Sequence, residues 1–186
     1  AVARFPDLRS AANTVIVAMQ MGIPVARIEL LDDVQMDACI RYSKLDGYEA
    51  KPTLFFEFHG TQAGVAEQAG QMQALVAEHG GGAFRWATAP EERTKLWKAR
   101  HNAYYAGLAL KPGSFGFATD ACVPISRLAD CVLETRADVD ATGLVCPIVG
   151  HVGDGNFHLV VLFAPNDPAE REKAEGLARR VSSRAI

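Results

Sequence analysis

Apolar and polar positions follow two different periods along the chain, which predict strands and helices in turn. Short apolar runs rich in β-branched and aromatic residues predict strands over residues 2–5, 24–31, 53–59, 84–87 and 115–125, and a hairpin over 144–163. Runs with helical spacing predict helices over 8–21, 32–45, 61–79 and 90–110, and from 126 and 168 onward. Helices that follow strands favour helices packed on a sheet, and the hairpin adds antiparallel pairs, so the expected class is α+β.

Length and composition fit one domain over residues 1–186. Of the 186 residues 49% are apolar, and no Pro-, Gly- or Ser-rich linker divides them. The net charge of −3 gives no basic surface for nucleic acid. No apolar run reaches the roughly 18–20 residues that a transmembrane segment needs. The four cysteines form no CxxC pair, so we expect buried free thiols, with disulfides or a structural zinc site as the alternative.

The segment Gly150–His158, "GHVGDGNFH", contains the most informative spacing. Asp154-Gly155 is typical of a two-residue type I′ turn, which would place His151 directly opposite His158. Opposed side chains share a face, so the two imidazoles could bind one metal ion at roughly 2.0–2.1 Å per nitrogen. Asn156 would offer its amide to a bound ligand. The alternative is a glycine-rich turn whose histidines are satisfied by ordinary hydrogen bonds.

Arg100 falls near the middle of the apolar face of the helix predicted over 90–110. A guanidinium there is costly unless it is paired, and a carboxylate can accept two parallel hydrogen bonds from it. The partner is either a protein carboxylate, such as Asp120, or a substrate acid; a structural ion pair or a snorkelling side chain is the alternative to a binding role. Tyr104 follows one turn later, and a core position is the alternative to a ligand contact there.

Several segments together resemble a known family. "GHVGDGNFH" is similar to the signature of the C-terminal domain of FAD-linked oxidases of the vanillyl-alcohol-oxidase type. Four further segments resemble the D-lactate dehydrogenase (cytochrome) branch of this family: "PVARIELLDDVQMDACIRYSKL", "PTLFFEFHG", "EERTKLWKARHNAYYA" and "TDACVPISRL". The similarity runs in order along essentially the whole chain.

The resemblance implies a ferredoxin-like-related cap domain, a largely antiparallel sheet with helices packed on one face. It implies that His151 and His158 bind a divalent metal, zinc or manganese, and that Arg100 holds the substrate carboxylate beside Asn156 and Tyr104. The complete protein would oxidise D-lactate or a similar small D-2-hydroxy acid to the 2-oxo acid, with hydride transfer to FAD.

The resemblance also implies that parts of the active site lie outside residues 1–186. We expect the FAD-binding domain to precede this chain. We expect a C-terminal tail, with the third metal ligand and the catalytic base, to lie beyond Ile186. No catalytic residue is therefore assigned within the chain, which alone would be inactive.

The resemblance bears on partners and alternatives as well. The electron acceptor would be a cytochrome, a quinone or an electron-transfer flavoprotein, in a cytoplasmic or peripheral membrane protein of a bacterium or in a mitochondrion. Tyr104 and Ala118 stand where diacid-specific relatives carry Thr and Lys, which favours a short monoacid. A glycolate oxidase subunit, a D-2-hydroxyglutarate dehydrogenase-like domain and a non-catalytic metal-binding or regulatory α+β module remain alternatives.

Overall fold

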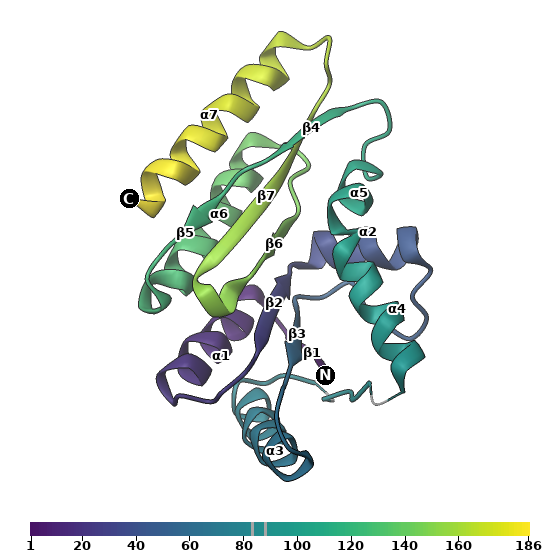
Figure 1. The fold of residues 1–186 in the computed structure, drawn as a ribbon. Coiled ribbons are helices and arrows are strands. Elements are labelled where there is room, and N and C mark those ends of the chain that lie inside the picture. Colours follow the sequence, from purple (N-terminus) through teal and green to yellow (C-terminus); the bar gives the residue numbers. More distant parts are fainter. Residues whose placement is uncertain (83, 88) are drawn as a thin grey trace.

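A computed structural model describes residues 1–82, 84–87 and 89–186 (Figure 1). The strands are β1 (Val2–Arg4), β2 (Arg27–Leu31), β3 (Thr53–Glu57), β4 (Phe115–Ala118), β5 (Ala121–Cys122), β6 (Ile148–Gly150) and β7 (Asn156–Phe163). The α-helices are α1 (Leu8–Gln20), α2 (Asp33–Ser43), α3 (Gln62–Glu78), α4 (Pro90–His101), α5 (Ala103–Leu108), α6 (Leu128–Thr142) and α7 (Pro168–Ala185). Two short 3₁₀ turns, η1 (Ile125–Arg127) and η2 (Val152–Asp154), complete the set.

The strands form one antiparallel sheet in the order β1-β3-β2-β6-β7-β4, with β5 also paired to β7. Helices connect most of the strands, so the predicted α+β class and the antiparallel sheet are confirmed. The strand expected over 84–87 is wrong, because these residues contribute only an isolated bridge between Arg85 and Val2.

Helices cover both faces of the sheet. Neighbouring strand residues alternate between two apolar cores: Leu30 belongs to the larger core and Leu31 to the smaller one. The larger core packs beneath α1, α3, α6 and α7, and the smaller one packs beneath α2, α4 and α5 (Figure 1). Helices were expected on one face of the sheet only. They cover the face of the larger core, but α2, α4 and α5 also cover the other face. The candidate functional residues lie on the face of the smaller core.

The long helix predicted over 90–110 is divided at Asn102. Its backbone has φ −82° and ψ 5°, away from helical values, and its N–H still bonds to the carbonyl oxygen of Lys98 at 3.0 Å. Asn has a low helix propensity, which accounts for a weak point here. The side chains of Ala103 and Ala106 pack into the smaller core, whereas Tyr104 is 38% exposed. The core position considered for Tyr104 is therefore wrong.

All four cysteines are free thiols, as expected. Cys39, Cys131 and Cys146 are buried, but Cys122 is exposed, contrary to expectation. Burial raises the pKa of the Cys146 thiol to about 11, so this group is a poor nucleophile at neutral pH. In the described residues, no helix combines the length and the apolar character that crossing a bilayer requires.

Candidate functional site

The connection between β6 and β7 is longer than the predicted type I′ turn. The chain makes the 3₁₀ turn η2 and then adopts a left-handed conformation at Gly155, with φ 74°. A Cβ at Gly155 would clash with the carbonyl oxygen of Val123, so glycine is required there. Val149 lies opposite His158, and the N–H of Asn156 bonds to the carbonyl oxygen of His151 at 3.3 Å. The predicted opposition of His151 and His158 is therefore wrong.

The two histidines still meet, because the register differs from the predicted one by two residues. Side chains on a strand alternate with a period of two, so a two-residue shift keeps each side chain on its face. His151 and His158 become diagonal neighbours, with ring centroids 6.0 Å apart and ring planes at 86°.

Each imidazole is oriented through its Nδ1 atom. Nδ1 of His151 lies 2.6 Å from Oε1 of Glu29, and Nδ1 of His158 lies 3.0 Å from the carbonyl oxygen of Thr119. Carboxylate and carbonyl oxygens accept hydrogen bonds, so Nδ1 carries the proton in both rings and each neutral ring keeps a lone pair on Nε2. Metal-binding histidines are commonly oriented in this way.

Thr119 supports His158 because it interrupts the edge strand. The N–H of Thr119 bonds to the carbonyl oxygen of Leu159 at 3.0 Å, as in a regular antiparallel pair. The N–H of Leu159 bonds instead to Oγ1 of Thr119 at 3.0 Å. The Thr119 carbonyl is thereby left to accept from His158, and the strand predicted over 115–125 is divided into β4 and β5.

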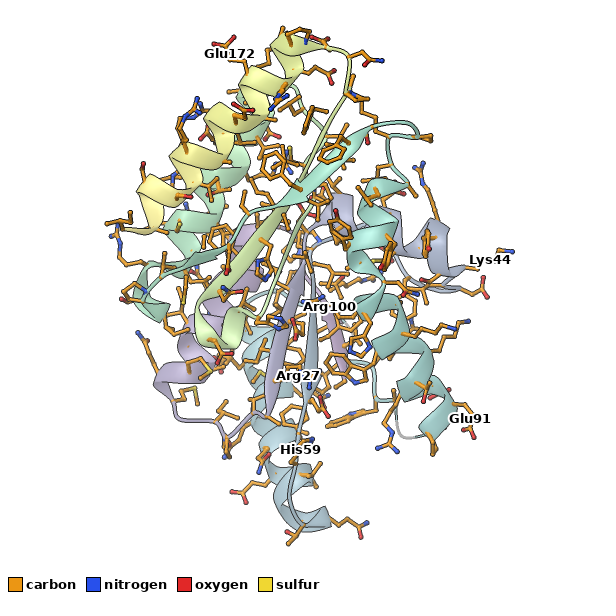
Figure 2. All side chains as sticks on the ribbon, turned by 45° about the horizontal axis from the view of Figure 1, so that its top comes forward. Arg27, Lys44, His59, Glu91, Arg100 and Glu172 are labelled. Atoms are coloured by element: carbon orange, nitrogen blue, oxygen red, sulfur yellow. The ribbon has the colours of Figure 1, made fainter. Side chains whose placement is uncertain are left out.

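Arg100 of α4 lies against the sheet (Figure 2). It pairs there with Glu29 of β2. Its Nε and Nη2 atoms lie 3.2 and 2.7 Å from Oε2 of Glu29. The side chain of Glu29 is 1% exposed and that of Arg100 is 13% exposed. The protein partner of Arg100 is thus Glu29, and the suggested partner, Asp120, lies elsewhere.

Asp120 instead lies beside the second histidine. Its Oδ1 atom accepts a hydrogen bond of 2.7 Å from Nδ2 of Asn156 and lies 3.4 Å from Nδ1 of His158. Asn156 therefore lies next to His158, although its amide already donates to a carboxylate. The hydroxyl of Tyr104 donates to the carbonyl oxygen of Gly116 at 3.2 Å, and within the described part of the chain no hydrogen bond joins Tyr104 to Arg100, His151 or His158.

Glu29 is the residue that sequence reasoning missed. Its carboxylate joins the two groups that were considered separately, because Oε1 faces His151 and Oε2 faces Arg100. One signal was present: Glu29 is the only charged residue within the apolar run Ile28–Leu31. A buried carboxylate in a central strand requires a cationic partner, and Arg100 was an apolar-face cation that required an anion.

Ile186 lies away from this cluster. It follows α7, the helix that packs on the larger core, and the site residues lie on the opposite face of the sheet. The Ile186 side chain is exposed and borders a small hollow together with Val123 and Arg184. Ile186 thus takes no part in the site. The expectation that the catalytic base and the third metal ligand lie beyond Ile186 is tested by none of these contacts and stays a prediction.

A cavity of about 840 Å³ opens beside the cluster. Aromatic side chains line much of it, among them Phe58, Trp86 and Trp97, together with His101 of α4. Arg100, His151 and His158 do not contribute to its lining. The predicted site residues therefore gather on the sheet face of the smaller core and do not line the cavity.

The donor atoms of His151 and His158 fit a divalent metal ion, since two neighbouring imidazoles each keep Nε2 for it. Two ligands do not complete a metal site. Within residues 1–82, 84–87 and 89–186, no group of three or more His, Cys, Asp or Glu side chains could hold a metal ion. Within the described residues, His151 and His158 could therefore supply at most two ligands to such an ion.

Comparison with known proteins gives one family for the whole chain. The chain is 45% identical over 186 residues to "Probable D-lactate dehydrogenase, mitochondrial" of Danio rerio, covering all of this chain and 37% of that protein. It is 41% identical over 177 residues to "D-lactate dehydrogenase [cytochrome], mitochondrial" of Arabidopsis thaliana, covering 95% of this chain and 31% of that protein. The chain thus spans about a third of the length of these curated relatives.

Solved structures of other proteins share the fold of this chain. The 4-ethylphenol oxidase from Gulosibacter chungangensis superposes with a TM-score of 0.67 at 14% identity, over 97% of this chain and 42% of that one. The family model for the C-terminal domain of FAD linked oxidases matches residues 1–186. The chain therefore belongs to the family of FAD linked oxidases, C-terminal domain.

Proposed function

We propose that the chain is the substrate domain of a flavin-dependent dehydrogenase that oxidises D-lactate, or a similar short D-2-hydroxy acid, to the 2-oxo acid. The observation that carries the proposal is the placement of His151, His158 and Arg100 on one face of the sheet, where Glu29 joins Arg100 to His151 and the ring of His158 lies beside that of His151. Relatives at 45% and 41% identity are named D-lactate dehydrogenases, which supports the same substrate.

Arg100 can hold a substrate carboxylate while it stays paired with Glu29. A guanidinium has five N–H groups on several edges. Glu29 occupies the edge formed by Nε and Nη2, which leaves the edge formed by Nη1 and Nη2. Two parallel hydrogen bonds from that edge would orient the acid and fix the position of its C2 hydrogen. The two interpretations of Arg100, a protein ion pair and a substrate clamp, are therefore compatible.

The metal site of this proposal uses Nε2 of His151 and Nε2 of His158, with a third ligand from another part of the complete protein. Zinc or manganese bound there would act as a Lewis acid on the substrate hydroxyl. Nδ1 of His151 donates to Glu29 and Nδ1 of His158 donates to Thr119, so in each neutral ring the lone pair that would bind the metal lies on Nε2.

The other components of the reaction lie outside the residues of this cluster. FAD would accept the hydride from C2 of the substrate, and a base from beyond Ile186 would take the hydroxyl proton. Electrons would then pass to an acceptor such as a cytochrome, a quinone or an electron-transfer flavoprotein. The names of the relatives favour a cytochrome and, in a eukaryote, a mitochondrial location.

A short monoacid suits the residues near Arg100, which is proposed to bind the substrate carboxylate. The hydroxyl of Tyr104 is already bonded to the carbonyl oxygen of Gly116, and Ala118 of β4 has no charge to offer a second carboxylate. The chain thus provides no anchor for a diacid at either position.

The test is Arg100→Lys in the complete protein. A lysine ammonium is a point charge that cannot reproduce two parallel hydrogen bonds, so we expect KM for D-lactate to rise roughly tenfold or more and kcat to fall. Steady-state kinetics with D-lactate, L-lactate and glycolate would measure this change and the substrate preference together. Lys98→Arg, on a more exposed position of α4, is the matched control and should keep wild-type kinetics. Wild-type kinetics in Arg100→Lys would remove Arg100 from the site.

A further inference from the structure

We propose that Glu29 is a positioning residue that holds Arg100 and His151 in one arrangement and so couples binding of the substrate carboxylate to binding of the metal. This inference rests on the proposed function, because it assigns roles within the same site. Each oxygen of the Glu29 carboxylate has its own partner: Oε1 lies 2.6 Å from Nδ1 of His151, and Oε2 lies 2.7 Å from Nη2 of Arg100.

The position of Glu29 in the sheet makes its carboxylate rigid. β2 has β3 on one side and β6 on the other, and Glu29 itself lies opposite Phe55. Its neighbours Ile28 and Leu30 are buried in the larger core, and Leu31 is buried in the smaller one. Because the backbone on both sides of Glu29 is fixed by packing, its side chain presents both oxygens at one place.

Burial makes the two interactions of Glu29 interdependent. A fully buried carboxylate is costly to leave without a partner, so losing either Arg100 or His151 would disturb the Glu29 side chain that orients the other. Glu29 also removes freedom from two mobile groups. It holds one edge of the flexible Arg100 side chain, and it fixes the ring orientation and tautomer of His151.

A side chain with one oxygen and one amide nitrogen cannot perform both tasks. In Glu29→Gln the amide oxygen could accept from Arg100 or from His151, while the NH₂ group would face the other donor. We therefore expect Glu29→Gln to weaken the two binding functions together. Arg100→Lys, by contrast, should weaken only binding of the carboxylate.

The experiment compares wild type, Glu29→Gln and Arg100→Lys in the complete protein, with Zn²⁺ and D-lactate as probes. Calorimetry on the metal-depleted protein measures the Kd for Zn²⁺, and steady-state kinetics separate KM from kcat. Glu29→Gln should weaken Zn²⁺ binding about 10–100-fold, the usual effect of losing a partner of a metal-binding histidine, and should raise KM for D-lactate roughly tenfold. Arg100→Lys should raise KM and keep the Kd for Zn²⁺ within about twofold.

Asp32→Asn is the matched control, because Asp32 is an equally buried carboxylate three residues further along the chain that touches none of these groups. It should leave both the Kd for Zn²⁺ and KM unchanged. Glu29→Asp provides a second variant that keeps the charge but is too short to reach both partners, and it should show a smaller loss of both functions. A variant series in which Zn²⁺ binding and KM change independently at Glu29, or not at all, overturns the coupling.

The outcomes separate this inference from the proposed function. If wild type binds Zn²⁺ but oxidises none of the acids, the proposed function fails, while the Zn²⁺ titrations still report whether Glu29 orients His151. If wild type oxidises D-lactate but Glu29→Gln keeps both constants, the proposed function stands and the role of Glu29 is overturned.

Discussion

Two buried carboxylates lie on either side of the junction between β2 and α2, and they have different environments. Glu29 is 1% exposed and pairs with Arg100 and His151 on the face of the smaller core. Asp32 is fully buried, and its Oδ2 atom lies 3.4 Å from Nη1 of Arg136 in α6, which packs on the opposite face. The alternation of side chains along β2 explains why two acids so close in the chain have partners on opposite faces.

The partners of Asp32 are satisfied within the fold. Its Oδ1 atom accepts from the N–H of Gln35 at 2.7 Å and so caps α2, while Nη1 of Arg136 also donates to the carbonyl oxygen of Cys146. Desolvation by burial outweighs these interactions and raises the pKa of Asp32 to about 7. The partners of Glu29, in contrast, keep atoms for which no hydrogen bond is found in the described residues, Nη1 of Arg100 and Nε2 of His151. Burial of a carboxylate alone therefore does not identify a site; the unused atoms of its partners do.

The largest difference between Glu29 and Asp32 should appear in stability when the arginine partner of each carboxylate is removed. Arg100→Met leaves Glu29 buried with His151 alone, so we expect a loss of about 3–5 kcal/mol in the free energy of unfolding. Arg136→Met should cost less, about 1–2 kcal/mol at pH 6, because Asp32, with its pKa raised to about 7, is already mostly protonated there and leaves no unpaired buried charge. Urea unfolding of both variants, followed by circular dichroism, measures the two losses. Equal losses would mean that the two acids are held in the same way.

The pH dependence of stability gives a second contrast. The pKa of Asp32 is raised from 3.8 to about 7, so between these values the folded state binds more protons than the unfolded state. The free energy of unfolding must then fall as the pH rises from about 4 to about 7, by at most about 1.4 kcal/mol per pH unit from this group. Subtracting the values for Asp32→Asn, measured at the same pH values, removes the contributions of other groups. A difference that stays constant or increases with pH would contradict the raised pKa.

Most of the fold could be predicted from the sequence because its elements are strongly periodic and well capped. The run 53–59 and the helices beginning near Thr61 and Pro168 were found within a few residues of their actual bounds. The division of the predicted helix at Asn102 was missed, because the apolar pattern continues through this position and one residue of low helix propensity does not by itself end a helix. The second helical layer was missed for a similar reason: strand residues that are apolar on both faces do not show how many helices cover each face.

The candidate site could be predicted only in part. Arg100 and the two histidines were found from local features, a cation on an apolar face and a histidine pair around a glycine turn. The connection between Arg100 and His151 through Glu29 was missed, because Glu29 lies 71 positions from Arg100 and 122 positions from His151 in the chain. The turn length was also misjudged, but its error of two residues kept both histidines on the correct face.

The smallest expected effect is on stability and concerns Asp32 as the N-cap of α2. Asp32→Ala removes the acceptor for the N–H of Gln35, whereas Asp32→Asn keeps a side-chain oxygen there. We expect the alanine variant to be less stable than the asparagine variant by about 1 kcal/mol, the usual contribution of an N-cap side chain. Urea unfolding at pH 8 measures the difference, and the KM of both variants for D-lactate should equal that of wild type. A raised KM in Asp32→Ala, similar to the change expected for Glu29→Gln, would contradict the division between a carboxylate that stabilises the fold and one that positions the site.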